Sequence, residues 1–237
     1  MGSHASTMPD CVPVVARSAL AYATAAAPWT FDFVPSPPAA AAALKRGLDV
    51  AFTIALLLLT SPVLLAAMLV IRLGSRGPVF FVQQRVGLRA AEFSMFKLRT
   101  MVANAERLEN SMARGEASAF LKVRHDPRIT PVGRLLRKLS IDELPQLFNV
   151  LRGDMSLVGP RPLLRCDLQN LPPAARARRF LMKPGITGLW QVSGRSDCSD
   201  EERVRLDQEY VERWTPWLDL VILARTVPAV LLMRGAS

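Results

Sequence analysis

The strongest constraint on this chain is an uncharged, apolar run of 22 residues from Val50 to Ile71. A helix rises about 1.5 Å per residue, so this run would just cross a hydrocarbon layer about 30 Å thick. Half of the 237 residues are hydrophobic and the mean hydropathy is +0.20, which is high for a soluble basic protein. The run therefore predicts a membrane helix, and a plain transmembrane span is its simplest form.

Two features favour a bent helix over a straight span. Pro62 lacks an N–H donor and bends a helix, while the Ser61 hydroxyl can satisfy part of the backbone that is left exposed. Basic residues flank the run on both sides, and cytoplasmic loops are enriched in such residues. We therefore predict a re-entrant helix hairpin over residues 44–76, broken at Ser61 and Pro62, that enters and leaves the membrane by one face. The flanking basic residues are Lys45, Arg46, Arg72, Arg76, Arg85 and Arg89.

The formal net charge is +10, from 30 Lys and Arg against 20 Asp and Glu. Such a charge favours anionic partners, namely nucleic acid, acidic lipid surfaces or phosphorylated substrates. A nucleic-acid binder gains nothing from the apolar excess, and the aromatic content is only 7%. We therefore expect anionic membrane lipids and a phosphorylated substrate as partners, and no nucleic acid.

The cysteines and histidines limit the chemistry of the site. Cys11, Cys166 and Cys198 are far apart and odd in number, so they predict neither a disulfide framework nor a C-x-x-C site. His4 and His125 are the only histidines, which disfavours a His-rich metal site or a Ser-His-Asp triad. Any base or metal ligand should therefore be a carboxylate.

The remaining sequence divides into a leader and a larger C-terminal domain. Residues 1–43 are rich in Ala and Pro and are expected to be disordered or weakly helical, and their opening MGSH resembles an expression-tag remnant. A signal peptide is the alternative, although the start lacks a basic n-region. Residues 77–237 are expected to form a small cytoplasmic catalytic domain, so that the whole is a mostly helical α/β protein associated with a membrane.

Local patterns predict the elements of this domain. They are short strands at 79–87 and 92–101, a polar helix over 104–117, a loop at 126–133, a helix over 133–140, an irregular Gly-rich segment at 183–195 and a helix over 199–214. Ser199 and Glu202 fit a capping box at the start of that last helix. Residues 216–234 suit an interfacial amphipathic helix with Trp214 and Trp217 near the headgroups, and a core helix is the alternative.

Two adjacent carboxylates, Asp142 and Glu143, stand in the stretch SIDELPQLFNVLRGDMSLVGPRP, before an apolar helical pattern. Ser140 with Glu143 three residues later fits a capping box, and acidic residues suit the first turn of any helix. The pair is therefore either an acidic helix cap or a pair of reacting groups.

The basic residues around the pair favour chemistry on phosphate. Arginine forks bind phosphate oxygens at two points, which a solvated face does not need. Neither a Walker A sequence nor G-x-G-x-x-G is present, so those phosphate-binding loops are excluded. On a diphosphate substrate, one carboxylate could attack phosphorus and the other could hold Mg²⁺. The clustered basic residues are Lys97, Arg99, Arg134, Arg137, Lys138, Arg152 and Arg161.

Taken together, these features resemble the bacterial sugar transferase family, the monotopic phosphoglycosyl transferases that act on polyprenyl phosphate. The resemblance covers about three quarters of the chain, from Lys45 to Val227. Each motif is weak alone, but the set in this order is specific. The motifs are KRGLDV, Ser61–Pro62, GPVFFVQQRVG, FKLRTM, DELPQLFNVLRGDMSLVGPRP, KPGITGLWQVSGR and LDQEYVERW.

The resemblance implies roles for individual residues. The family nucleophile is the Asp of the D-E pair and the Glu helps to bind Mg²⁺ or Mn²⁺, which implies these roles for Asp142 and Glu143. Many members carry a smaller residue at the position of Trp190, a difference that bears on substrate shape. Family members also carry the re-entrant membrane helix. The substrate-binding residues expected here are Lys97, Arg99, Arg137, Arg161, Gln191 and Arg195.

The activity that the resemblance implies is transfer of a sugar-1-phosphate from a UDP-sugar to undecaprenyl phosphate, with release of UMP. It would take place at the cytoplasmic face of the bacterial inner membrane, as the first membrane step in building an exopolysaccharide, capsule, O-antigen or glycan. Glucose or galactose is expected from the family alone. The extra N-terminal transmembrane bundle of larger members is not found, so we expect the minimal catalytic form, and a homodimer is compatible with it. The alternative is a non-enzymatic basic membrane-binding module, in which the acidic pair only caps a helix.

Overall fold

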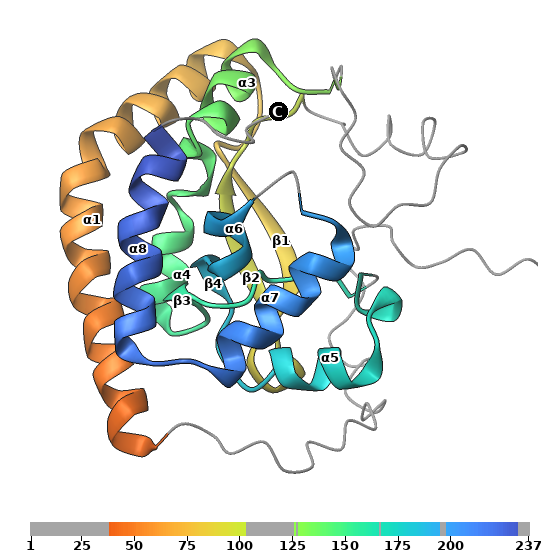
Figure 1. Ribbon diagram of the computed structural model, residues 1–237. Coiled ribbons are helices and arrows are strands. Elements are labelled where there is room, and N and C mark those ends of the chain that lie inside the picture. The colour runs from red at the N-terminus through yellow and green to blue at the C-terminus, as the bar shows by residue number, and fades with distance from the viewer. Residues whose placement is uncertain (1–37, 103–125, 127, 166, 195–197, 232–237) are drawn as a thin grey trace, which may run out of the picture.

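The computed structural model describes residues 38–102, 126, 128–165, 167–194 and 198–231 (Figure 1). The leader at 1–37 with its tag remnant, the helix predicted over 104–117 and the predicted substrate-binding residue Arg195 lie outside the described residues. The rest is a mostly helical α/β structure with two small sheets.

The apolar run lies in α1, a helix of 36 residues from Ala39 to Gly74. Among the described residues it is the one helix long and apolar enough to cross a membrane, and only 17% of its most apolar window is buried. Pro62 lies inside it, and the Ser61 hydroxyl donates to the Leu58 carbonyl at 2.9 Å. Figure 1 shows that α1 changes direction midway along its length. The predicted apolar helix is therefore present and is continuous through Ser61 and Pro62, while its re-entrant course in the membrane stays a prediction.

A β-hairpin follows α1, as the sequence predicts. Strand β1 (Phe80–Val86) pairs antiparallel with β2 (Glu92–Leu98), with Phe80 opposite Leu98 and Val86 opposite Glu92. The 3-10 turn η1 (Leu88–Ala90) connects them. The hairpin brings the FKLRT motif, at its second strand, back toward the end of α1.

Three short helical elements come next. Helix α3 (Pro131–Lys138) begins where the Thr130 hydroxyl accepts from the Gly133 N–H at 2.9 Å. The observed helix therefore starts two residues before the predicted start at 133. The 3-10 turn η2 (Ile141–Glu143) leads to α4 (Gln146–Arg152). The capping box expected at Ser140 is wrong, because Ser140 adopts a left-handed conformation (φ 56°) and its side chain caps nothing.

The Gly-rich segment expected to be irregular contains regular structure. Strand β4 (Gly185–Thr187) pairs in parallel with β3 (Ser156–Val158), and α6 (Leu189–Ser193) follows it. A Cβ on Gly185 would lie 2.1 Å from the Gly159 nitrogen, so the backbones approach closely only because both residues are glycine. The strands have three residues each, too few to produce an alternating pattern that predicts a strand.

The C-terminal helices cover this small sheet. The 3-10 turn η3 (Asp167–Asn170) and α5 (Pro173–Arg179) precede β4, and α7 (Asp200–Glu212) and α8 (Pro216–Leu231) follow α6. The predicted cap of α7 is confirmed, since the Ser199 hydroxyl accepts from the Glu202 N–H at 3.2 Å. In α8, Ile222 is fully buried while Trp217 is 71% exposed, so this helix has one core face and one open face.

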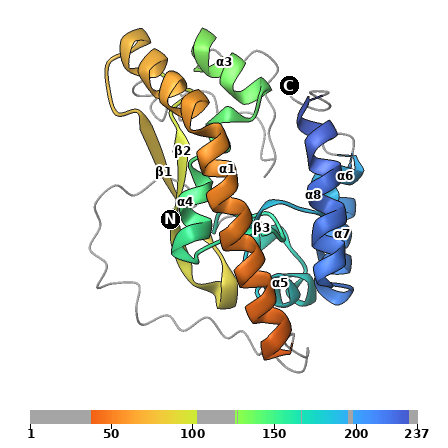
Figure 2. The same ribbon diagram turned by 90° about the vertical axis from the view of Figure 1, so that its left-hand side faces the viewer.

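The core lies where α4, α7 and α8 meet the β3–β4 sheet, and α1 closes one side of it. Figure 2 shows α1 crossing the molecule, with the hairpin and α4 on one side and α7 and α8 on the other. A second apolar cluster joins the C-terminal half of α1 to β2 and α3 through Leu64, Ala67, Ile71, Leu98 and Leu136. The helix α1 is therefore part of the folded core as well as the apolar surface.

Candidate active site

The acidic pair lies on the turn between α3 and α4. Ser140 reverses the chain through its positive φ, and its N–H donates to the Arg137 carbonyl at 3.0 Å. A left-handed conformation costs a non-glycine residue about 1–2 kcal/mol, and such strain concentrates at functional sites. Helix α4 begins only at Gln146, after Pro145, so neither carboxylate caps it. The acids are therefore placed by the turn, and an acidic cap does not explain them.

Asp142 is buried and its neighbours act on it in opposite directions. Only 8% of the surface of this residue is exposed. Burial raises the pKa of the Asp142 carboxyl and the adjacent Glu143 charge adds to this, whereas Lys97 and Arg137 lower it. Asp142 thus combines partial desolvation with two nearby cations.

Glu143 and Arg137 are held by specific partners. The Lys97 ammonium donates to Glu143 Oε1 at 3.0 Å, in a half-buried ion pair. Arg137 Nε donates to the Thr100 hydroxyl at 2.9 Å, which fixes its guanidinium near the acidic pair. The structure therefore brings together four of the residues predicted from the sequence, two from the turn, one from β2 and one from α3.

Arg99, predicted to bind substrate, forms hydrogen bonds within the fold. It is 9% exposed, and its guanidinium donates to the Ser75 carbonyl, the Ser75 hydroxyl and the Arg76 carbonyl at 2.9, 2.8 and 3.1 Å. The neighbouring Gly77 has φ 125°, and a Cβ there would lie 2.2 Å from Arg99 Nη1. Arg99 therefore secures the end of α1 in this structure.

Arg161 and Gln191 belong to a second group, around Trp190. The Arg161 guanidinium lies over the Trp190 ring at 5.8 Å from its centroid, and Gln191 Nε2 donates to the Ile186 carbonyl at 3.1 Å. Arg203 on α7 also lies over the ring, at 5.3 Å. Sequence reasoning missed Arg203, because a charged residue in a polar helix pattern resembles a solvated face.

Comparison with known proteins decides the family. The profile of the family described as Bacterial sugar transferase matches residues 40–233. This chain belongs to that family.

Curated members are similar over most of this sugar transferase. The exopolysaccharide production protein ExoY of Sinorhizobium fredii is 41% identical over 198 residues, which cover 81% of this chain and 87% of that protein. The UDP-glucose:undecaprenyl-phosphate glucose-1-phosphate transferase of Caulobacter vibrioides is 43% identical over 209 residues, 85% of this chain and 75% of that protein. The undecaprenyl-phosphate galactose phosphotransferase of Salmonella typhimurium is 44% identical over 200 residues, 81% of this chain but only 41% of that protein.

The donor set of the site suits a hard cation that is shared with a substrate. Among the described residues, no group of three or more His, Cys, Asp or Glu side chains could hold a metal ion by itself. Mg²⁺ commonly binds through one or two carboxylates together with phosphate oxygens and water. The adjacent Asp142 and Glu143 fit that requirement, with Lys97 sharing the Glu143 carboxylate.

Proposed function

We propose that this sugar transferase moves a sugar-1-phosphate, of glucose or galactose, from a UDP-sugar to undecaprenyl phosphate and releases UMP. The observation that carries the proposal is the buried Asp142, which lies beside Lys97 and Arg137 without capping a helix. The names of the relatives from Caulobacter vibrioides and Salmonella typhimurium support the same reaction class. The relatives named for exopolysaccharide production support a place at the start of such a pathway.

The reaction proceeds in two displacements at phosphorus. An Asp142 carboxylate oxygen attacks the sugar-bearing phosphorus, and the bond to the UMP oxygen breaks with its electron pair leaving on UMP. An oxygen of the lipid phosphate then attacks the same phosphorus, and the bond to Asp142 breaks to regenerate the carboxylate. The soluble donor and the lipid acceptor therefore need not occupy the site together.

The chain supplies positive charge and shielding for these steps. Arg137 and Lys97 stabilise the charge that develops on phosphate oxygens, in a site where water is partly excluded. Burial of Asp142 also protects the acyl phosphate from hydrolysis. Glu143 would hold Mg²⁺ or Mn²⁺ together with substrate oxygens, and a bound ion would neutralise charge on the diphosphate.

The contacts at the two ends of α1 support a re-entrant arrangement in the inner membrane. Near its start, Lys45 pairs with Asp219 at 2.6 Å, and at its end Ser75 accepts from Arg99. Both ends are thus attached to one folded domain, whereas a straight span would place them on opposite faces of the membrane. The hairpin, with the catalytic domain on the cytoplasmic face, accounts for the exposed apolar side chains between them.

The decisive experiment separates the first displacement from the second. Purified protein is mixed with UDP-glucose or UDP-galactose without lipid, and UMP is measured. About one UMP per active site is expected, with the sugar-phosphate found by mass spectrometry on the peptide that contains Asp142. The matched variant Asp142→Asn should release none while remaining folded. Undiminished UMP release by that variant would refute the aspartyl intermediate.

A further inference from the structure

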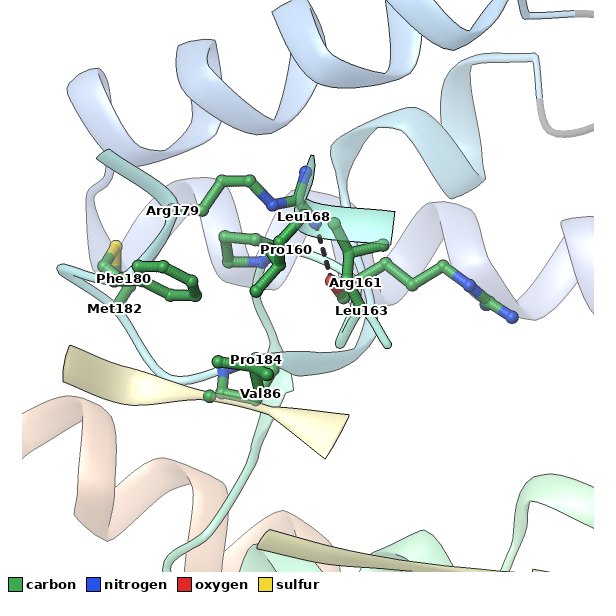
Figure 3. Close-up of a pocket in the computed structure, with 10 residues that line it drawn as sticks. Val86, Pro160, Arg161, Leu163, Leu168, Arg179, Phe180, Met182 and Pro184 are labelled. Atoms are coloured by element: carbon green, nitrogen blue, oxygen red, sulfur yellow. Dashed lines mark hydrogen bonds between the residues drawn. The ribbon is translucent and has the colours of Figure 1, made fainter. Parts of the chain in front are cut away.

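The main chain of Arg161 is held by a buried ion pair that the reaction scheme above does not use. Arg179, at the end of α5, donates from Nη2 to the Arg161 carbonyl at 2.6 Å (Figure 3). Its Nη1 donates to the Asp207 carboxylate. Arg179 is 6% exposed and Asp207, on α7, is 1% exposed. One guanidinium fork thus links α7 to the loop that follows β3.

The side chain of Arg161 has a separate contact. Figure 3 is a close-up of a pocket that Arg161 and Arg179 help to line, and the Arg161 guanidinium extends away from it. It lies over the Trp190 ring, at 5.8 Å from the centroid, and Arg203 lies over the same ring at 5.3 Å. Arg203 Nη1 pairs with Asp200 Oδ1 at 3.0 Å, which anchors this cation on α7. Within the described residues, no carboxylate hydrogen-bonds to the Arg161 guanidinium.

This combination indicates an anionic ligand. Two guanidinium groups on one indole ring repel each other, and of the two only Arg203 forms an ion pair with a carboxylate among the described residues, although the charge of Arg161 also acts on the buried Asp207. The donors of Arg161 remain available for phosphate oxygens, to which an arginine fork is well matched. A flexible arginine loses rotamer freedom when it binds, so holding it beforehand favours binding.

We propose that Asp207, Arg179 and Trp190 are positioning residues for Arg161, with the first two holding its main chain and the third holding its guanidinium over the indole. This rests on the proposed function and on the substrate-binding role predicted for Arg161 from the sequence, here assigned to phosphate oxygens of the nucleotide-sugar. Trp190 therefore contributes to UDP-sugar affinity through Arg161.

The test measures kcat and KM for UMP release from the nucleotide-sugar that the wild type uses, with lipid acceptor present. Trp190→Leu should raise KM about tenfold, and Trp190→Phe should recover most of the loss because a phenyl ring still attracts a cation. Arg179→Lys keeps the charge beside Asp207 but cannot also reach the Arg161 carbonyl, so it should raise KM similarly. Arg178→Lys is the matched control, since Arg178 forms an ion pair with Glu212 at the surface, and it should stay within about twofold.

A double-mutant cycle distinguishes positioning from general support of the fold. In an Arg161→Ala background, Trp190→Leu should change KM by less than about twofold, because the residue that it positions is gone. A repeated tenfold loss in that background would show that Trp190 acts without Arg161 and would overturn the proposal. The phenylalanine variant and Arg179→Lys keep the test valid if Trp190→Leu fails to fold.

The same data separate this proposal from the proposed function. An active wild type with an inactive Asp142→Asn variant supports the reaction, and independent effects of Trp190 and Arg161 would then overturn the positioning alone. A wild type that releases no UMP from any UDP-sugar overturns both.

Discussion

Asp142 and Glu143 are neighbours in the chain, yet their surroundings give them different properties. Asp142 is buried and its pKa is raised by burial and by Glu143, whereas Glu143 forms an ion pair with Lys97. Two carboxylates placed in different surroundings are typical of divided catalytic roles. The residue proposed to attack phosphorus and the residue proposed to bind the cation thus differ in their environment.

The raised pKa predicts a cost in stability. Between its ordinary value of 3.8 and its higher folded value, Asp142 is protonated in the folded state and ionised in the unfolded state, so stability falls as pH rises through this interval. At pH 7 the buried charge destabilises the fold, and Asp142→Asn should raise Tm by about 2–4 °C for each kcal/mol relieved. Thermal unfolding should show this gain at pH 7 and a smaller gain as the pH approaches 4. A lower Tm at pH 7 would contradict the expectation.

The cation site gives a second prediction at this scale. Glu143→Gln removes the charge that would hold Mg²⁺ and leaves Lys97 without its carboxylate partner. We expect UMP release to fall at least about 100-fold with little change in Tm, because the pair is half-buried. Excess EDTA should abolish release by the wild type, and added Mg²⁺ or Mn²⁺ should restore it. Full turnover in EDTA would exclude a metal.

At the scale of elements, the sequence predicts what has a long or strong pattern. The apolar run, the two hairpin strands and the capped α7 are all found, because several residues contribute to each pattern. The sequence could not predict that the side chains of Lys97 and Arg99 have different surroundings, one at the acidic pair and the other at the end of α1. Alternation would place both on one face, but β2 ends at Leu98, and the backbone of Arg99 then pairs with Val79 while its side chain reaches the end of α1. Such endpoints depend on tertiary contacts.

Trp214 illustrates a second limit at the element scale. A tryptophan before an apolar helix is typical of a membrane interface, but its Nε1 instead donates to the buried Asp219 carboxylate at 3.2 Å. A buried carboxylate requires donors, and that demand arises only once α7 and α8 pack together. Trp217 is exposed, and its position near the lipid headgroups stays a prediction.

The proposed re-entrant course of α1 predicts that both of its ends lie on the cytoplasmic side of the membrane. Lys45 is buried, so the test places single cysteines at Ala43 and Arg76, which are both exposed, after the native cysteines are replaced by serine. An impermeant thiol reagent added to intact cells should label neither, and lysis should expose both. Labelling of only one before lysis would establish a span. Pro62→Ala restores a backbone donor in the middle of α1 and should shift part of the protein toward that labelling pattern.

At the scale of the whole molecule, α1 joins the apolar surface to the catalytic domain. Large apolar residues are exposed along it, while Lys45, Asp49 and Thr53 on its N-terminal half are buried against the domain. Asp49 accepts from the Leu157 N–H at 3.1 Å, and Arg46 donates to the Val150 and Leu151 carbonyls at 2.6 and 2.8 Å. Strand β3, which precedes the loop that carries Arg161, and helix α4, which follows the acidic turn, are therefore held by the helix that carries the apolar surface. The most exposed large apolar residues on α1 are Leu58, Leu59, Leu65 and Leu73.

The attachment of α1 predicts how the molecule fails when one charge is removed. Lys45 donates to Asp219 Oδ2 at 2.6 Å and to the Val158 carbonyl at 3.1 Å, and the Tyr210 hydroxyl oxygen lies 2.7 Å from Asp219 Oδ1 and 3.0 Å from the same carbonyl oxygen. Lys45→Met keeps the bulk of the side chain but leaves the Asp219 carboxylate buried without a counter-charge. Such a change typically costs about 3–5 kcal/mol.

For a chain of this length that cost corresponds to a Tm lower by about 6–20 °C, measured in detergent, with UMP release lost at temperatures where the wild type is active. Flotation with lipid vesicles should be unchanged, because the exposed apolar face of α1 is intact. Adding Asp219→Asn to Lys45→Met removes the uncompensated charge and should recover at least half of the lost Tm, since the two residues act as a pair. Arg213→Met is the matched control, because Arg213 pairs with Glu209 on the exposed surface, and it should move Tm by less than about 2 °C. An unchanged Tm in Lys45→Met would show that the ion pair does not secure α1, and that the other contacts of α1, such as the hydrogen bonds of Arg46 and Asp49, hold the membrane helix and the catalytic domain together.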